Sequence, residues 1–381
     1  MPRPARADLV VWLSLAIITV LVVAVLLPDA TRAAIVGVAD PRPPAVAPVL
    51  LAATAALGVL LLAPRAGGSW VAVQAVAAVG ASVWTAALVL AREPVFDGRE
   101  VGSFFGNGIS DLLAALPGTL PAVVLGLGGG LAVVLLNAAV RSLSGEVQAG
   151  RLMPAVALSP GLGFGVDGLA VGGVVAVCGV LALSALASER GRGLLSSTVL
   201  GLLSGVLLVV GALAGFAASA AGVGLLCIYF LRRRSLMIFV AGLGVLVSLL
   251  SAAAIGWSWP VEFGAASALR LADPAGLAAG VVVATLAVAV IGGPVHRASW
   301  RKLRGTPAWP VMLTGLVAAV VDVLTRPAAL GIVPAAVIWL PLLVVAASAP
   351  PRSAGTPDGP EPVAVLLTAL CGVAVAALPL G

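Results

Sequence analysis

Long apolar stretches that almost no charged residue interrupts dominate this chain. Apolar residues make up 61% of its 381 residues and charged residues only 9%, whereas soluble domains carry about 25% charged residues. A bilayer crossing needs about 20 mostly apolar residues. Lipid offers the backbone no hydrogen-bond partner, so the crossing segments must satisfy their own backbone groups, as helices do. We therefore predict an all-α, polytopic transmembrane helix bundle in which residues 1–381 form one integral membrane domain.

Clusters of glycine, proline or arginine divide the chain into apolar runs of roughly the length of a crossing. These runs are 9–27, 48–63, 70–91, 119–140, 168–187, 195–213, 216–231, 236–255, 275–293, 309–325, 328–347 and 363–380. The first run is too long for the hydrophobic region of a typical signal peptide. We therefore interpret it as a retained first helix.

The arginine distribution predicts one more crossing. Basic residues concentrate in cytoplasmic loops, and Arg3 and Arg6 therefore place the N-terminus in the cytoplasm. A single crossing at 168–187 would then leave Arg232–Arg234 outside, against the rule. The conflict disappears if the short segment 152–166, which prolines and glycines break, also crosses. The prediction is about 12–13 spans, with the C-terminus outside and Arg326 on the outer side, against the rule.

Three connecting segments have features of their own. Residues 101–116 carry an apolar stripe at helical spacing, which fits either a helix lying in the outer interface or an ordinary loop packed over the bundle. The predicted outer loop 256–274 places Trp257 and Trp259 at the interface, where aromatic residues gather. Residues 350–362 are rich in proline, glycine and serine and predict a flexible inner loop.

Few polar residues lie within the predicted spans, and a buried charge there usually serves a function. Asp167 follows the broken segment, Asp322 lies near the outer end of 309–325, and Asn137 lies late in 119–140. We take these three as candidate substrate-binding residues. Each also has a structural alternative: Asp167 as a helix N-cap, Asp322 in an interfacial ion pair with Arg326 four residues on, and Asn137 in an interhelical hydrogen bond.

The sequence lacks the residue patterns that several kinds of active site and metal site require. His296 is the only histidine, and it lies among arginines in a predicted loop, which argues against a histidine metal cluster or a Ser-His-Asp site. The three cysteines lie within apolar runs and lack metal-ligand spacing. No catalytic residue, cofactor or metal is therefore predicted. The net charge of +6 comes from basic residues, which we interpret as markers of cytoplasmic loops. It does not indicate a surface that binds nucleic acid.

The function that these features favour is a permease for an unknown, apolar or lipid-like substrate, because the many prolines and glycines suit moving helices. The alternative is a non-catalytic membrane subunit or scaffold of an envelope or secretion complex, with other membrane subunits or an ATPase as partners. A weaker alternative is a polyprenyl-phosphate-dependent glycosyltransferase that uses Asp29 and Asp40. With Lys302 as its only lysine, the chain has the composition of a GC-rich bacterial genome, and we expect it in the plasma membrane.

Overall fold

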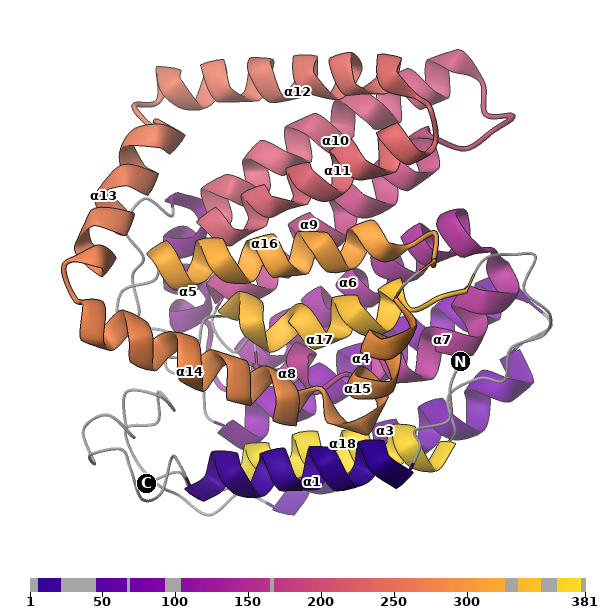
Figure 1. The fold of residues 1–381 in the computed structure, drawn as a ribbon. Coiled ribbons are helices and arrows are strands. Elements are labelled where there is room, and N and C mark those ends of the chain that lie inside the picture. The colour runs from indigo at the N-terminus through magenta and orange to yellow at the C-terminus, as the bar shows by residue number, and fades with distance from the viewer. Residues whose placement is uncertain are drawn as a thin grey trace.

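The computed structural model describes residues 6–21, 46–66, 69–92, 104–164, 168–303, 305–325, 335–350 and 362–377. Throughout these ranges the regular elements are helices, which confirms the all-α bundle (Figure 1). Arg326, Asp167, Asp29, Asp40 and nearly all of the predicted inner loop lie outside the described residues.

The helices follow one another along the chain. Their bounds are α1 Arg6–Leu21, α3 Val46–Ala66, α4 Trp70–Arg92, α5 Phe104–Ala115, α6 Leu120–Ser144, α7 Glu146–Ala157, α8 Gly161–Phe164, α9 Gly168–Ala187, α10 Leu194–Ala214, η2 Phe216–Ala220, α11 Ala221–Leu231, α12 Ser235–Ala254, α13 Trp259–Leu271, α14 Pro274–Ile291, α15 Gly293–Lys302, α16 Trp309–Thr325, α17 Ala335–Ala347 and α18 Pro362–Ala377.

Helix length and composition fit a membrane protein. Six helices, namely α3, α4, α6, α10, α12 and α14, are long and apolar enough to cross a bilayer. Shorter apolar helices occur in α1, α9, η2–α11 and α16. Together with α7–α8, α17 and α18, they overlap every crossing that the sequence predicts, and most of them run side by side in Figure 1.

Hydrogen bonds between distant segments define one end of the bundle. Arg232 Nη2 donates to the carbonyl oxygen of Ser142 at 2.6 Å, and Thr306 Oγ1 donates to that of Ala347 at 2.7 Å. Ser144 Oγ, at the end of α6, donates to the carbonyl oxygen of Ala349 just after α17 at 3.5 Å. The C-terminal ends of α6, α11 and α17 and the start of α16 therefore lie together. Asp8, at the start of α1, pairs with Arg297 and Arg301 of α15. We call this the basic end, and it holds Arg141, Arg192, Arg232, Arg234, Arg297 and Arg301.

The broken segment crosses the bundle, as predicted. Helices α6 and α9 both end at the basic end, because Ser142 Oγ donates to the carbonyl oxygen of Ala185 at 3.0 Å. The chain between them must therefore travel back across, and α7–α8 does so. The crossing begins at Glu146 rather than at residue 152. The reason is Gly145, whose φ of 102° ends α6 and lets α7 start one residue later.

Two predicted loops are helices. Residues 293–302 form α15 at the basic end, and residues 259–271 form α13, which lies across the opposite end of the bundle (Figure 1). Trp259 stacks on Phe263 with 4.7 Å between ring centroids. Arg270 of α13 is buried and donates to the carbonyl oxygen of Val323 at 3.4 Å. This arginine is a further basic residue at the predicted outer end, where it satisfies a carbonyl near the end of α16.

Small residues bring the helices into close contact. A side chain on Gly126 or Gly130 of α6 would meet backbone oxygens of α4, and one on Gly205 of α10 or Gly244 of α12 would meet the backbone of the partner helix. The hydrophobic effect does not drive helices together within lipid, so close contacts of this kind stabilise their association instead. Gln74 of α4 adds an interhelical hydrogen bond, which its Nε2 donates to the carbonyl oxygen of Val134 at 3.4 Å.

Candidate functional site

The three residues chosen from the sequence do not form one site among the described residues. Asp167 lies outside them. Asp322 is 5% exposed, and its Oδ2 accepts the backbone N–H of Ala336 at 2.9 Å. Ala336 lies in the first turn of α17, whose N–H groups have no partner within the helix. Asp322 therefore caps α17 at the end of the bundle opposite the basic end.

Asn137 lies in the half of α6 nearer the basic end. It is 1% exposed, and neither its amide nitrogen nor its amide oxygen has a hydrogen-bond partner in the described part of the chain. A buried amide without partners is costly. It lies four residues before Arg141, one turn deeper in the bundle.

The broken crossing is closed off by its neighbours. Helices α3, α4, α6, α17 and α18 all contact α7 or α8. The indole Nε1 of Trp84, which is fully buried in α4, donates to the carbonyl oxygen of Ser159 at 3.1 Å. Proline at position 160 faces α18, where a side chain on Gly372 would meet it. Protein therefore covers the described part of the break, which is how non-helical backbone is tolerated at membrane depth.

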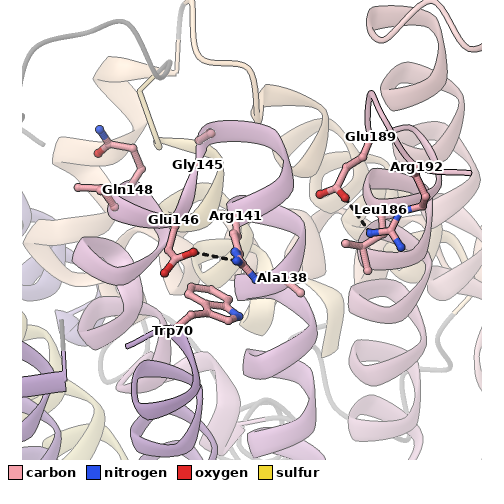
Figure 2. A pocket seen from close by; sticks show the side chains of 11 residues that line it. Trp70, Ala138, Arg141, Gly145, Glu146, Gln148, Leu186, Glu189 and Arg192 are labelled. Carbon is pink, nitrogen blue, oxygen red and sulfur yellow. Dashed lines mark hydrogen bonds and ion pairs between the residues drawn. The ribbon is translucent and has the colours of Figure 1, made fainter. Parts of the chain in front are cut away.

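A pocket opens at the basic end, where α4, α6, α7 and α9 meet (Figure 2). Its volume is about 700 Å³, within the range of small-molecule sites. Unlike the apolar bundle below, its lining is rich in charge, and it comprises Trp70, Ala138, Arg141, Ser144, Gly145, Glu146, Val147, Gln148, Leu186, Glu189 and Arg192.

Two arginine–glutamate pairs lie in this pocket. Arg141 Nη2 donates to Glu146 Oε2 at 2.8 Å, and its guanidinium lies 4.6 Å from the centroid of the Trp70 ring. Figure 2 shows this group apart from the second pair, in which Arg192 Nη2 donates to Glu189 Oε2 at 2.7 Å. The side chains of Arg141 and Glu146 are 45% and 50% exposed. A pair this exposed contributes only about 0–1 kcal/mol to stability, so separating the two side chains costs little free energy.

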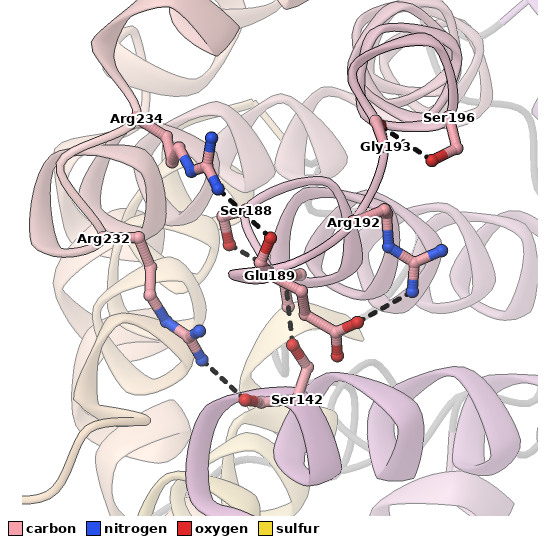
Figure 3. A network of polar contacts seen from close by, with 9 residues as sticks. Ser142, Ser188, Glu189, Arg192, Gly193, Ser196, Arg232 and Arg234 are labelled. Carbon is pink, nitrogen blue, oxygen red and sulfur yellow. Dashed lines mark hydrogen bonds and ion pairs between the residues drawn. The ribbon is translucent and has the colours of Figure 1, made fainter.

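Glu189 belongs to a wider network of polar contacts at the rim of the pocket (Figure 3). Arg234 Nη2 donates to the backbone carbonyl oxygen of Glu189 at 3.3 Å. Burial raises the pKa of the Glu189 carboxyl, but hydrogen bonds from Arg192 and Ser142 and the charges of Arg192 and Arg232 outweigh it, and the pKa lies below its ordinary value. The carboxylate is thus charged at neutral pH, and its stabilising contribution is lost only as the pH falls through that lowered pKa.

His296 does not add to the positive charge of this end. It is 6% exposed in α15, and burial lowers its pKa to about 4, against a smaller opposing effect of a hydrogen bond with the backbone of Pro341. The imidazole is therefore neutral at physiological pH. Among the residues that the structure describes, no three His, Cys, Asp or Glu side chains lie close enough together to hold a metal ion.

The sequence did not single out this pocket. The candidate site residues taken from the sequence include none of the residues that line it. One signal was present: each arginine has a glutamate within five residues, in a chain with few acids. No protein-family model, curated protein or solved structure matches the chain.

Proposed function

We propose that the chain is a permease of a bacterial plasma membrane, with the basic end facing the cytoplasm and the arginine–glutamate pocket as its cytoplasmic entrance. The observation that carries this proposal is the pocket itself. A charged cavity of about 700 Å³ at the junction of four otherwise apolar helices suits a polar ligand or headgroup. A protein that only scaffolds partners needs no such cavity.

Two further features support transport. The pocket borders α7, the first half of the broken crossing, and discontinuous helices line the binding sites of many transporters. The unpartnered amide of Asn137 lies one turn below Arg141 and extends the polar character of the pocket into the bundle. A ligand or water at this depth would satisfy it.

The orientation has its own test. In a protein without native cysteines, we place single cysteines at Arg190 and Ser235, exposed positions near the basic end, and at Ser258, an exposed position before α13. A maleimide that cannot cross membranes should label only the Ser258 variant in intact spheroplasts, because basic residues mark the cytoplasmic side. All three variants should react after permeabilisation. Labelling of Arg190→Cys or Ser235→Cys in intact spheroplasts would reverse the orientation.

Transport is tested with the purified chain in proteoliposomes. The panel contains labelled amino acids, betaines and phosphate esters, together with a fluorescent phospholipid whose flipping between leaflets is followed by quenching. We expect transport of at least one of these compounds, and the double variant Arg141→Gln/Arg192→Gln should lose it. Flux of none of them would contradict the proposal.

The alternative, a non-catalytic subunit of a larger membrane assembly, has one observation in its favour. Only 22% of the apolar window of α12 and 18% of that of α14 are buried within the chain, which leaves helix faces for lipid or for partner helices. Purification in mild detergent separates the two proposals. Partners that co-purify in fixed stoichiometry, together with an inactive isolated chain, would favour the subunit.

A further inference from the structure

We propose that the pocket binds a zwitterion, a molecule or headgroup that carries one ammonium and one phosphate or carboxylate. Its ammonium takes the place of the Arg141 guanidinium over Trp70 and beside Glu146, and its anionic group binds Arg192. The inference rests on the proposed function in treating this pocket as the entrance, and it adds the chemical class of the ligand.

The charges of the pocket favour a zwitterion. The pocket holds two arginines and two glutamates in two pairs, so its formal charge is zero. A ligand with a net charge, such as a lone anion or a lone cation, would leave the occupied pocket with that net charge. A zwitterion keeps the occupied pocket neutral, which avoids the penalty of an uncompensated, partly buried charge.

The Trp70 side of the pocket already shows how it holds a cation. The guanidinium of Arg141 lies 4.6 Å from the Trp70 ring centroid while it pairs with Glu146. An aromatic face next to a carboxylate is a favourable site for an ammonium, and for a quaternary ammonium above all. Arg141 is 45% exposed, so its side chain has room to swing into solvent when a ligand cation replaces it.

The Arg192 side offers the anion site. Arg192 donates to Glu189 through Nη2, while its Nε is buried and has no hydrogen-bond partner in the described part of the chain. A guanidinium binds phosphate or carboxylate best through two parallel N–H groups. The Arg192 side chain is 31% exposed, so a rotation of its guanidinium would bring the unpartnered Nε–H to an anion in the pocket. The backbone bond from Arg234 holds the Glu189 segment in place.

Binding to the purified full-length protein in detergent tests the proposal by calorimetry. The zwitterionic probes are glycerophosphocholine and glycine betaine, and the single-charge probes are choline and inorganic phosphate. We expect at least one zwitterion to bind at least tenfold more tightly than either single-charge probe. Equal or tighter binding of phosphate or choline alone, or no binding of either zwitterion, would overturn the proposal.

Substitutions in the pocket test which residues bind the ligand. Trp70→Leu and Arg192→Gln should each weaken zwitterion binding at least tenfold, while Trp70→Phe keeps an aromatic face and retains most of it. Arg190→Gln removes the same charge two residues away, at an exposed position outside the pocket lining, and should bind as the unchanged protein does. Thermal melting identifies any variant that fails to fold. Unchanged affinity in folded Trp70→Leu and Arg192→Gln proteins would place the ligand elsewhere.

A zwitterion of this kind has two sources, a free solute or a lipid headgroup. Nanodiscs made of phosphatidylcholine should compete with the soluble probe if the headgroup is the ligand, whereas nanodiscs of phosphatidylglycerol should not. Binding that is equal in both lipids identifies a solute, and either result supports the zwitterion class. Binding without flux in proteoliposomes would remove the permease proposal and leave the ligand assignment standing.

Discussion

Replacing Gly244 by leucine is expected to separate α12 from α10 and to cause a large loss of stability. A side chain on Gly244 would fall on the backbone carbonyl of Leu202, and one on Gly205 would fall on that of Ala241. Because both obstacles are backbone, no rotamer change relieves the clash. Overpacking costs about 1–3 kcal/mol in cores that adapt, so we expect at least the upper end of that range.

Gly242 provides the matched control for this prediction. It lies on the same helix, two residues away, and a side chain there would have nothing within 4 Å. Gly242→Leu should therefore melt close to the unchanged protein, while Gly244→Leu melts far below it or fails to purify as a single species in detergent. Similar melting of the two variants would show that α10 and α12 do not pack through these glycines.

Replacing Asp322 by alanine is expected to destabilise the fold, whereas Asp322→Asn is expected to have a smaller effect. The Asp322 carboxylate accepts the backbone N–H of Ala336 at 2.9 Å in a buried setting. Losing the acceptor of a buried N–H costs about 1–3 kcal/mol, and asparagine retains an acceptor oxygen. Graded unfolding in denaturing detergent, followed by tryptophan fluorescence, measures the difference.

An exposed cap serves as the control for Asp322. Asp273 accepts the backbone N–H of Gly276 at 2.9 Å at the start of α14, but it is exposed, so water can replace it. Asp273→Ala should therefore cost less than Asp322→Ala. If Asp322→Ala and Asp322→Asn both keep full stability and lose transport, Asp322 is a ligand-binding group rather than a cap.

The crossings could be predicted because a single physical requirement sets them. A bilayer demands apolar runs of a fixed length, and these runs are visible in the sequence one at a time. Even the broken crossing was predictable, since the position of Arg232–Arg234 required it. The residue at which this crossing begins was not predictable, because the change of direction depends on the backbone conformation of Gly145. Many helices tolerate a glycine near their ends.

The pocket was harder to predict because it depends on which helix ends meet. Trp70 begins α4, Arg141 lies in the last turn of α6 and Glu189 follows α9, and each residue alone fits an ordinary interfacial position. Asp322 has a second role that the sequence could not show. A carboxylate in a span suggests function, and here the Asp322 carboxylate also accepts a backbone N–H of the next helix, α17. Isolated residues therefore predicted the bundle well, whereas the pocket depends on contacts between helices.

The enclosure of α7–α8 has a consequence for how the protein is made. Two of the helices that shield the broken crossing, α4 and α6, precede it in synthesis, but α17 and α18 emerge from the ribosome about 180 residues later. Glu146, Arg151 and the proline-broken backbone make this segment a poor candidate for independent partitioning into lipid. We therefore expect the insertion machinery to hold it beside α4 and α6 until the last helices arrive. A chain truncated before α17 should leave α8 facing lipid, and it should be a substrate for membrane proteases.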